Sequence, residues 1–197
     1  MNKLESIDRA IVLFVNGLHT PLLDEIMWFL SGRFSLIPLY ILLLVLLKKY
    51  NFWQNTFVIL LGLVLTIFIA DQLSVHLFKN IFERYRPSHN EYLKHLLHFY
   101  EVNPGEFYKG GKYGFVSSHA TNFFALIFYL TPFYKEKKKL LFWSLVGIGC
   151  LVGLSRIYLG VHYLSDVLIG GLLGSLIGTC FSKLTYNFLT KSINRFE

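Results

Sequence analysis

The sequence predicts an all-α integral membrane protein, a single domain over residues 1–197 with about five spanning helices and an N-terminal interfacial helix. Of the 197 residues, 54% are hydrophobic and only 16% are charged, whereas a soluble domain carries charge on about a quarter of its residues. Apolar runs near the length that crosses a bilayer recur along the chain. Such runs must be helical in lipid, because an unpaired backbone N–H or C=O is costly there.

Residues 1–20 are predicted to hold the interfacial helix. Apolar and polar side chains alternate with helical spacing over 4–18, and the fully apolar run is too short to cross a bilayer. Pro21 is suited to the first turn of the next helix. Residues 22–47 are then expected to form one long or kinked spanning helix, interrupted at Ser31-Gly32-Arg33.

Four further crossings are predicted, at 57–78, 118–134, 140–154 and 164–184. The last is rich in small residues, which allow close helix approach, namely Gly170, Gly171, Gly174, Ser175 and Gly178. Residues 88–114 form a long polar segment, expected to be an extracytoplasmic loop or lid. A six-crossing arrangement is the alternative, because five crossings place Lys3 and Arg9 outside.

The basic residues indicate the orientation and the partners. Short Lys-rich loops stay cytoplasmic, and the chain has two, Lys48-Lys49-Tyr50-Asn51 and Lys135–Lys139, which fall on the same side as Lys183, Lys191 and Arg195. The net charge of +7 is spread over inter-helix segments instead of forming a basic domain. Membrane lipids with anionic head groups are therefore the expected partners, and nucleic acid is not. The oligomeric state cannot be read from the sequence.

The most polar helix junction is Ser155–Asp166, which contains Arg156, His162 and Asp166. Asp166 follows His162 by four residues, so the two side chains share a face if the second helix has begun there. A carboxylate beside an imidazole can hold one ring nitrogen's proton and leave the other nitrogen free to attack. Arg156 adds a guanidinium suited to phosphate oxygens. The junction therefore indicates phosphate chemistry at a membrane surface.

Two other clusters are expected on the same non-cytoplasmic edge. Lys79–Pro87 leaves one predicted helix with three cations, and Pro87 biases Arg86 toward extended backbone. Phe115–His119 enters the next helix, whose free N–H groups near Ser117 and Ser118 attract anions.

Together, the three segments resemble the signature of the type-2 phosphatidic acid phosphatase and vanadium haloperoxidase superfamily. Its pattern is K-x-x-x-x-x-x-R-P, then P-S-G-H, then S-R-x-x-x-x-x-H-x-x-x-D. The first and third parts match with every spacing kept, at Lys79, Arg86, Pro87, Ser155, Arg156, His162 and Asp166. The middle part, Val116-Ser117-Ser118-His119, has valine for the proline and serine for the glycine. Serine can replace glycine there if the backbone angles are open to other residues.

The resemblance implies a membrane lipid phosphatase that works through a phosphohistidine. His162 would be the nucleophile, Asp166 would fix its tautomer, and His119 would protonate the leaving oxygen and then activate water. The implied phosphate-binding groups are Lys79, Arg86, Arg156, the Ser117 hydroxyl and the Ser118 N–H. Cations at three positions can stabilise the charge of phosphoryl transfer, so neither a metal nor a cofactor is expected.

The expected substrate is a lipid phosphomonoester or diphosphate, with undecaprenyl diphosphate, phosphatidylglycerol phosphate, phosphatidic acid and lipid A phosphates as candidates. The expected location is a bacterial inner (plasma) membrane. The Lys-rich short loops predict that the site lies on its periplasmic or extracellular face. Two alternatives belong to other classes, a non-catalytic lipid-phosphate binding or transport protein and a vanadate-dependent haloperoxidase. The spanning helices argue against the haloperoxidase, and the paired histidines against the binding protein.

Several polar residues lie outside the pattern. Arg84 and Lys94 are expected to snorkel at the membrane interface. Asp71 suits either a polar network or a structural role inside the bundle. Three loop histidines are expected to be solvated rather than to bind metal, because their spacing fits no compact ligand motif, namely His89, His95 and His98.

Overall fold

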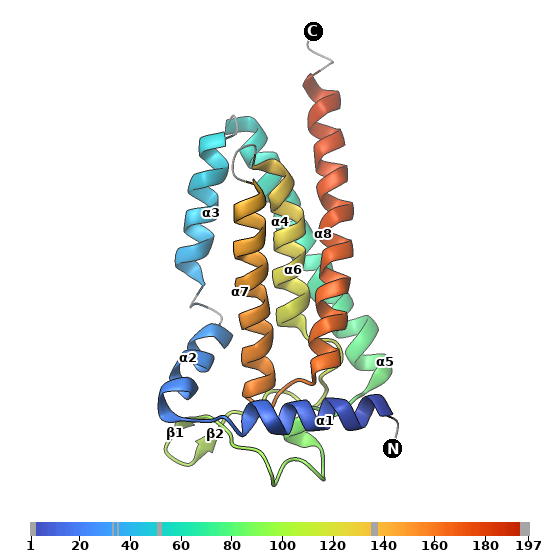
Figure 1. Cartoon of the computed structure of the whole chain (residues 1–197). Coiled ribbons are helices and arrows are strands. Elements are labelled where there is room, and N and C mark those ends of the chain that lie inside the picture. Colours follow the sequence, from blue (N-terminus) through green and yellow to red (C-terminus); the bar gives the residue numbers. More distant parts are fainter. Residues whose placement is uncertain (1–2, 33, 35, 51–52, 135–137, 194–197) are drawn as a thin grey trace.

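The computed structural model describes residues 3–32, 34, 36–50, 53–134 and 138–193. Helices that run side by side form the body of the molecule (Figure 1). They are α3 (Ile37–Tyr50), α4 (Trp53–Gln72), α6 (Ser118–Leu130), α7 (Lys138–Tyr158) and α8 (Leu164–Ile193). The all-α membrane bundle predicted from the sequence is thus confirmed.

Not every bundle helix is long enough to cross a bilayer by itself. Within the described residues, three segments are both long and apolar enough, namely Trp53–Phe82, Lys139–Tyr158 and Leu164–Lys191. The first joins α4 to a π-helix, η1 (Leu73–Lys79), and to α5 (Asn80–Phe82). Helices α3 and α6 have 14 and 13 residues. The number of crossings therefore stays a prediction.

The single long or kinked helix predicted over 22–47 is wrong, because this region forms two helices, but the predicted interruption at Ser31-Gly32-Arg33 begins where the first of them ends. α2 (Pro21–Ser31) ends at Gly32, whose backbone is extended, and α3 begins at Ile37. Thr20 caps α2, since its Oγ1 accepts the Leu23 N–H at 3.2 Å. The predicted segments at Arg33, Asn51, Lys135–Lys137 and Arg195 lie outside the described residues.

Helix α1 (Lys3–Asn16) lies across one end of the bundle instead of along it (Figure 1). Its axis is bent by 119° from that of α2. A stripe at helical spacing faces inward, with Asp8, Val12 and Asn16 all buried. Leu4 and Phe14 are exposed. This position suits the interfacial role that the sequence predicts for α1.

Glycines bring α6 and α8 into close contact, as the small residues of α8 predicted. A Cβ added at Gly174 would lie 2.1 Å from the Thr121 carbonyl oxygen, and one at Gly178 would lie 2.4 Å from that of Ala125. At the starts of the two helices, the Ser117 N–H donates to the Asp166 carbonyl oxygen at 3.0 Å. Close packing therefore sets the beginnings of α6 and α8 beside each other.

The segment between α5 and α6 covers this same end of the bundle (Figure 1). It contains the 3-10 helix η2 (Pro87–His89) and a two-stranded antiparallel sheet of β1 (Glu101–Asn103) and β2 (Glu106–Phe107).

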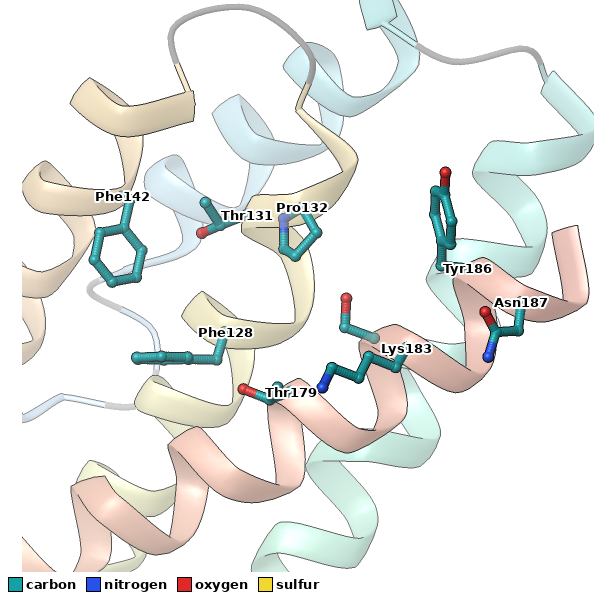
Figure 2. A pocket seen from close by; sticks show the side chains of 9 residues that line it. Phe128, Thr131, Pro132, Phe142, Thr179, Lys183, Tyr186 and Asn187 are labelled. Carbon is teal, nitrogen blue, oxygen red and sulfur yellow. The ribbon is translucent and has the colours of Figure 1, made fainter. Parts of the chain in front are cut away.

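At the opposite end, near the 3-10 helix η3 (Thr131–Phe133), lies a cavity of about 690 Å³. Figure 2 shows its lining, which comes from α6, η3, α7 and α8 and includes Phe128, Phe142 and Lys183.

Candidate active site

His162 lies in the turn between α7 and α8, and Asp166 in the first turn of α8. Gly160, at φ +67°, permits the sharp turn after α7. His162 precedes the helix, which begins at Leu164, yet its Nδ1 faces Asp166 Oδ2 at 3.4 Å. The Tyr163 N–H donates to the same oxygen at 3.0 Å. Both side chains are buried, at 1% and 0% exposure. The carboxylate thus lies beside Nδ1 of the imidazole, which is the arrangement that the sequence predicts for a nucleophile and its orienting group.

Arg156 comes from the last turn of α7 and is buried against two segments that the sequence did not connect with it. Its Nη2 donates to Tyr108 Oη at 2.8 Å, and its Nη1 donates to Ser31 Oγ at the end of α2. Among the described residues, its buried Nε and the buried Ser117 Oγ have no hydrogen-bond partner. Buried donors without partners are rare. Each of these two groups therefore has a donor available to a bound anion.

Arg86 is held by a short pairing of residues 84–86 with residues 112–114. The Arg86 N–H donates to the Lys112 carbonyl oxygen at 3.1 Å, and the Gly114 N–H donates to that of Arg84 at 2.9 Å. Arg86 is extended, at φ −64° and ψ 157°, as Pro87 predicted. Its Nε donates to the Tyr113 carbonyl oxygen at 3.0 Å.

Lys79 ends the π-helix and reaches the first residue of α6. Its Nζ donates to Ser118 Oγ at 2.6 Å, and Ser118 Oγ lies 2.7 Å from Ser74 Oγ. Ser118 begins α6 and is not among the described residues with positive φ. Serine therefore fits the position where the family pattern has glycine, as the sequence analysis required.

His119, the second residue of α6, lies within electrostatic range of four predicted site residues: Lys79, Arg86, Arg156 and His162. Lys79 is likewise within range of Arg86, Arg156 and Asp166. The structure therefore brings all three predicted segments together at one end of the bundle.

Burial and the neighbouring cations set the protonation of the predicted nucleophile. Burial, followed by the charges of Arg86, Arg156 and Lys79, holds the pKa of His162 well below its usual 6.5. Burial and the nearby Arg156 lower the pKa of Arg86 to about 10. At neutral pH the imidazole is therefore uncharged and the guanidinium charged. This is the combination that an attack on a phosphate needs.

Arg84 and Asp8 also lie against the site, and neither was predicted from the sequence to do so. The prediction that Arg84 snorkels is wrong, because its Nη1 donates to Asp166 Oδ1 and its Nη2 to Asp8 Oδ2, each at 2.7 Å. The spacing of Arg84 from Arg86 in the sequence could have indicated that Arg84 lies at the site. Arg84 and Arg86 are two residues apart, and on extended backbone such side chains point to the same side. The burial of Asp8, in a helix expected to be interfacial, gave no comparable signal.

The remaining polar residues have other partners. Lys94 Nζ pairs with Glu91 at 2.6 Å. Asp71 accepts a hydrogen bond from Asn122 at 3.1 Å inside the bundle. His98, predicted to be solvated, is only partly exposed, and its Nε2 lies 3.0 Å from Asp24 Oδ2 of α2.

The chain is similar to a protein family and to several known proteins. Residues 56–192 match the model of the PAP2 superfamily. Lipid A 4'-phosphatase of Porphyromonas gingivalis is 31% identical over 179 residues, which are 90% of this chain and 72% of the relative. The protein of the same name from Bacteroides thetaiotaomicron is 31% identical over 192 residues, 95% of this chain and 81% of the relative.

A solved structure has the same fold. It is the transmembrane PAP2 type phosphatidylglycerolphosphate phosphatase from Bacillus subtilis, with a TM-score of 0.63 and 26% identity over 97% of this chain and 88% of that one. The family match covers the three motif segments and all of the predicted site residues. The chain belongs to the PAP2 superfamily.

Proposed function

We propose that this chain is a membrane lipid phosphatase that transfers the phosphate of its substrate to His162 and then to water. The single observation that carries the proposal is the buried pair of His162 and Asp166, set among Lys79, Arg86 and Arg156. Phosphoryl transfer needs mainly positioning and stabilisation of charge on the phosphoryl oxygens. A neutral imidazole among cations supplies a nucleophile and that stabilisation together.

In the first step, His162 Nε2 attacks phosphorus and forms a P–N bond, while the bond from phosphorus to the lipid oxygen breaks. His119, as an imidazolium once the negative phosphate offsets the neighbouring cations, gives its proton to that oxygen. In the second step, His119 takes a proton from water, whose oxygen attacks phosphorus, and the P–N bond breaks to release phosphate. Ser117 Oγ and Arg156 Nε, both buried without partners among the described residues, are the donors offered to the phosphoryl oxygens. The cations carry the charge, so we expect the reaction to proceed without a metal.

The proposed substrate is the phosphomonoester of lipid A, because two relatives named as lipid A 4'-phosphatases each align with at least 90% of this chain. Phosphatidylglycerol phosphate is the second candidate, because the structural neighbour acts on that class of lipid and covers 97% of this chain.

We also propose that the site faces the periplasm or the extracellular side of a bacterial membrane. Lys48 and Lys49 are in the last turn of α3, and this end of α3 lies opposite the end of the bundle that α1 crosses (Figure 1). Excess Lys and Arg mark the cytoplasmic side.

The test is phosphate release by detergent-purified protein in EDTA from lipid A, phosphatidylglycerol phosphate, phosphatidic acid and undecaprenyl diphosphate. We expect release from lipid A in the wild type and none from His162→Ala. Acid-labile, base-stable labelling of the protein by ³²P-lipid would identify the phosphohistidine. Full activity of folded His162→Ala would overturn the mechanism, and release only without EDTA would overturn its metal independence.

A further inference from the structure

The nucleophile is connected to the N-terminal helix by a chain of charged hydrogen bonds. Asp166 Oδ2 faces His162 Nδ1, while Oδ1 accepts from Arg84 Nη1 at 2.7 Å. Arg84 Nη2 donates to Asp8 Oδ2 at 2.7 Å. Asp8, Arg84 and Asp166 come from α1, from the segment after α5 and from α8, so three distant parts of the chain meet here.

Asp8 is fixed at this position by α8 as well as by Arg84. Its Oδ1 accepts the Ser165 N–H at 3.0 Å, and its Oδ2 accepts the Ser165 hydroxyl. Ser165 Oγ in turn accepts from Arg84 Nη1 at 2.6 Å. The Arg84 guanidinium also lies 4.1 Å over the ring of Tyr163, the residue whose N–H donates to Asp166. Asp8 is only 2% exposed. A buried carboxylate with this many defined partners is not a surface charge.

The charges explain what the arrangement does. Arg84 is shared between two carboxylates, so the three groups together carry one negative charge. That charge faces an imidazole that becomes positive as it attacks phosphorus. With Asp8 neutral, Arg84 would be balanced by Asp166 alone, and less of the Asp166 charge would remain for His162. Asp8 also anchors the guanidinium of Arg84, which holds the Asp166 oxygen that does not face the imidazole. Without that anchor, the rotation of the Asp166 carboxylate would be less firmly fixed.

We propose that Asp8 and Arg84 are positioning residues for the reaction, so that α1 is part of the catalytic apparatus and not only an interfacial helix. They act through Asp166 and do not touch the substrate. The inference rests on the proposed function, since it assigns Asp166 the role of orienting His162.

Asp8→Asn should therefore lower kcat and leave KM nearly unchanged, because the phosphate-binding cations stay in place. Outer partners of metal-binding histidines typically contribute 10- to 100-fold to metal affinity or activity. By analogy we expect a loss of about 10-fold for Asp8→Asn and about 100-fold for Arg84→Gln. Arg84→Lys should recover part of the loss, because an ammonium can reach one carboxylate but cannot bridge both with a planar fork.

Glu5→Gln is the matched control. Glu5 is on the same helix and the substitution removes the same charge, but its partner is Arg9, and its side chain is 40% exposed. We expect kcat of Glu5→Gln within twofold of wild type.

Ser165→Ala tests the contact between Asp8 and Arg84 more mildly, since it removes the hydroxyl between them and keeps both charges. A loss of about threefold in kcat is expected for one such neutral hydrogen bond.

The deciding experiment is a double-mutant cycle, with kcat and KM measured for Asp8→Asn, Arg84→Gln and the double variant in detergent, beside wild type and His162→Ala. If Asp8 acts through Arg84, Asp8→Asn costs little in the Arg84→Gln background. The inference is overturned if the two losses multiply, if KM rises while kcat holds, or if Glu5→Gln is equally impaired. If Asp8→Asn does not fold, Ser165→Ala decides, and an unchanged kcat there overturns the inference. Activity that survives in His162→Ala would instead refute the proposed function.

Discussion

Lys79 Nζ donates a 2.6 Å hydrogen bond to Ser118 Oγ, so the serine that replaces the glycine of the family pattern holds a predicted phosphate-binding cation. Ser74 Oγ lies 2.7 Å from the same oxygen and joins the π-helix to this contact. π-Helical turns are frequent at functional sites. Here the turn brings Lys79 to the start of α6, where the helix offers its free N–H groups.

Ser118→Ala should lower kcat/KM by about 10-fold, because a hydrogen bond to a charged group contributes roughly 1.5–3 kcal/mol to holding that group in place. The measurement is phosphate release at substrate concentrations below KM. Ser175→Ala, which removes a serine hydroxyl from the middle of α8, is the control and should have wild-type activity. An increase in activity for Ser118→Ala would show that the serine competes with substrate for Lys79 instead of placing it.

Gly114→Ala should reduce kcat by about 100-fold, since misplacing a reacting group by about 1 Å can cost that much. A Cβ at Gly114 would lie 3.1 Å from Asp166 Oδ2 and from Arg86 Cγ, and 3.5 Å from His162 Nδ1. At Gly111, three residues earlier, an added Cβ has no neighbour within 4 Å among the described residues. Gly111→Ala is therefore the matched control. Equal kcat values for the two variants would contradict a backbone held against the nucleophile.

The sequence was sufficient to predict the groups that work through local spacing. Lys79 and Arg86 flank a helix end, and Arg156, His162 and Asp166 share one helix junction, so each set is constrained by short-range geometry. The close packing of α6 against α8 also followed from the small residues of α8. These features depend on residues near one another in the chain or on one helix face.

The contacts that the sequence analysis missed join residues far apart in the chain. Asp8 meets Ser165 across 157 positions, and Ser31 meets Arg156 across 125. No periodic pattern indicates where α1 and α2 cross the end of the bundle. The sequence did indicate an interruption at Ser31-Gly32-Arg33, where α2 ends, but not that the chain forms two separate helices there.

Wild-type protein should lose thermal stability faster than His162→Gln as the pH falls below about 6.5. The folded state keeps the imidazole neutral, because burial and the neighbouring cations depress the pKa of His162. The unfolded chain takes up a proton near the ordinary pKa, so each further pH unit favours unfolding by up to about 1.4 kcal/mol. Above about pH 7 both states are neutral and this contribution disappears.

The measurement is the apparent Tm of detergent-solubilised protein between about pH 7.5 and about pH 5 for both forms, a range chosen to span histidine titration. His95→Gln, which removes an exposed loop histidine, is the control. Parallel Tm curves for wild type and His162→Gln would mean that the imidazole is charged in the folded protein.

Gly174→Ala should destabilise the bundle more than any exposed glycine substitution, because α6 and α8 cannot separate without opening the site at their shared end. A Cβ at Gly174 would lie 2.1 Å from the Thr121 carbonyl oxygen and 2.9 Å from the Ala125 backbone nitrogen. Backbone atoms cannot move aside as a side chain can, so we expect a loss of about 1–3 kcal/mol in the free energy of unfolding, typical of overpacking.

In α7, an added Cβ at Gly147 meets no described atom within 4 Å. Gly147→Ala should keep the wild-type Tm or raise it slightly, since alanine favours the helix. Thermal unfolding of both variants in detergent, with kcat measured on the folded fraction, separates the two effects. If Gly174→Ala unfolds at the wild-type Tm and keeps its activity, α6 and α8 are not packed as closely as the glycines require.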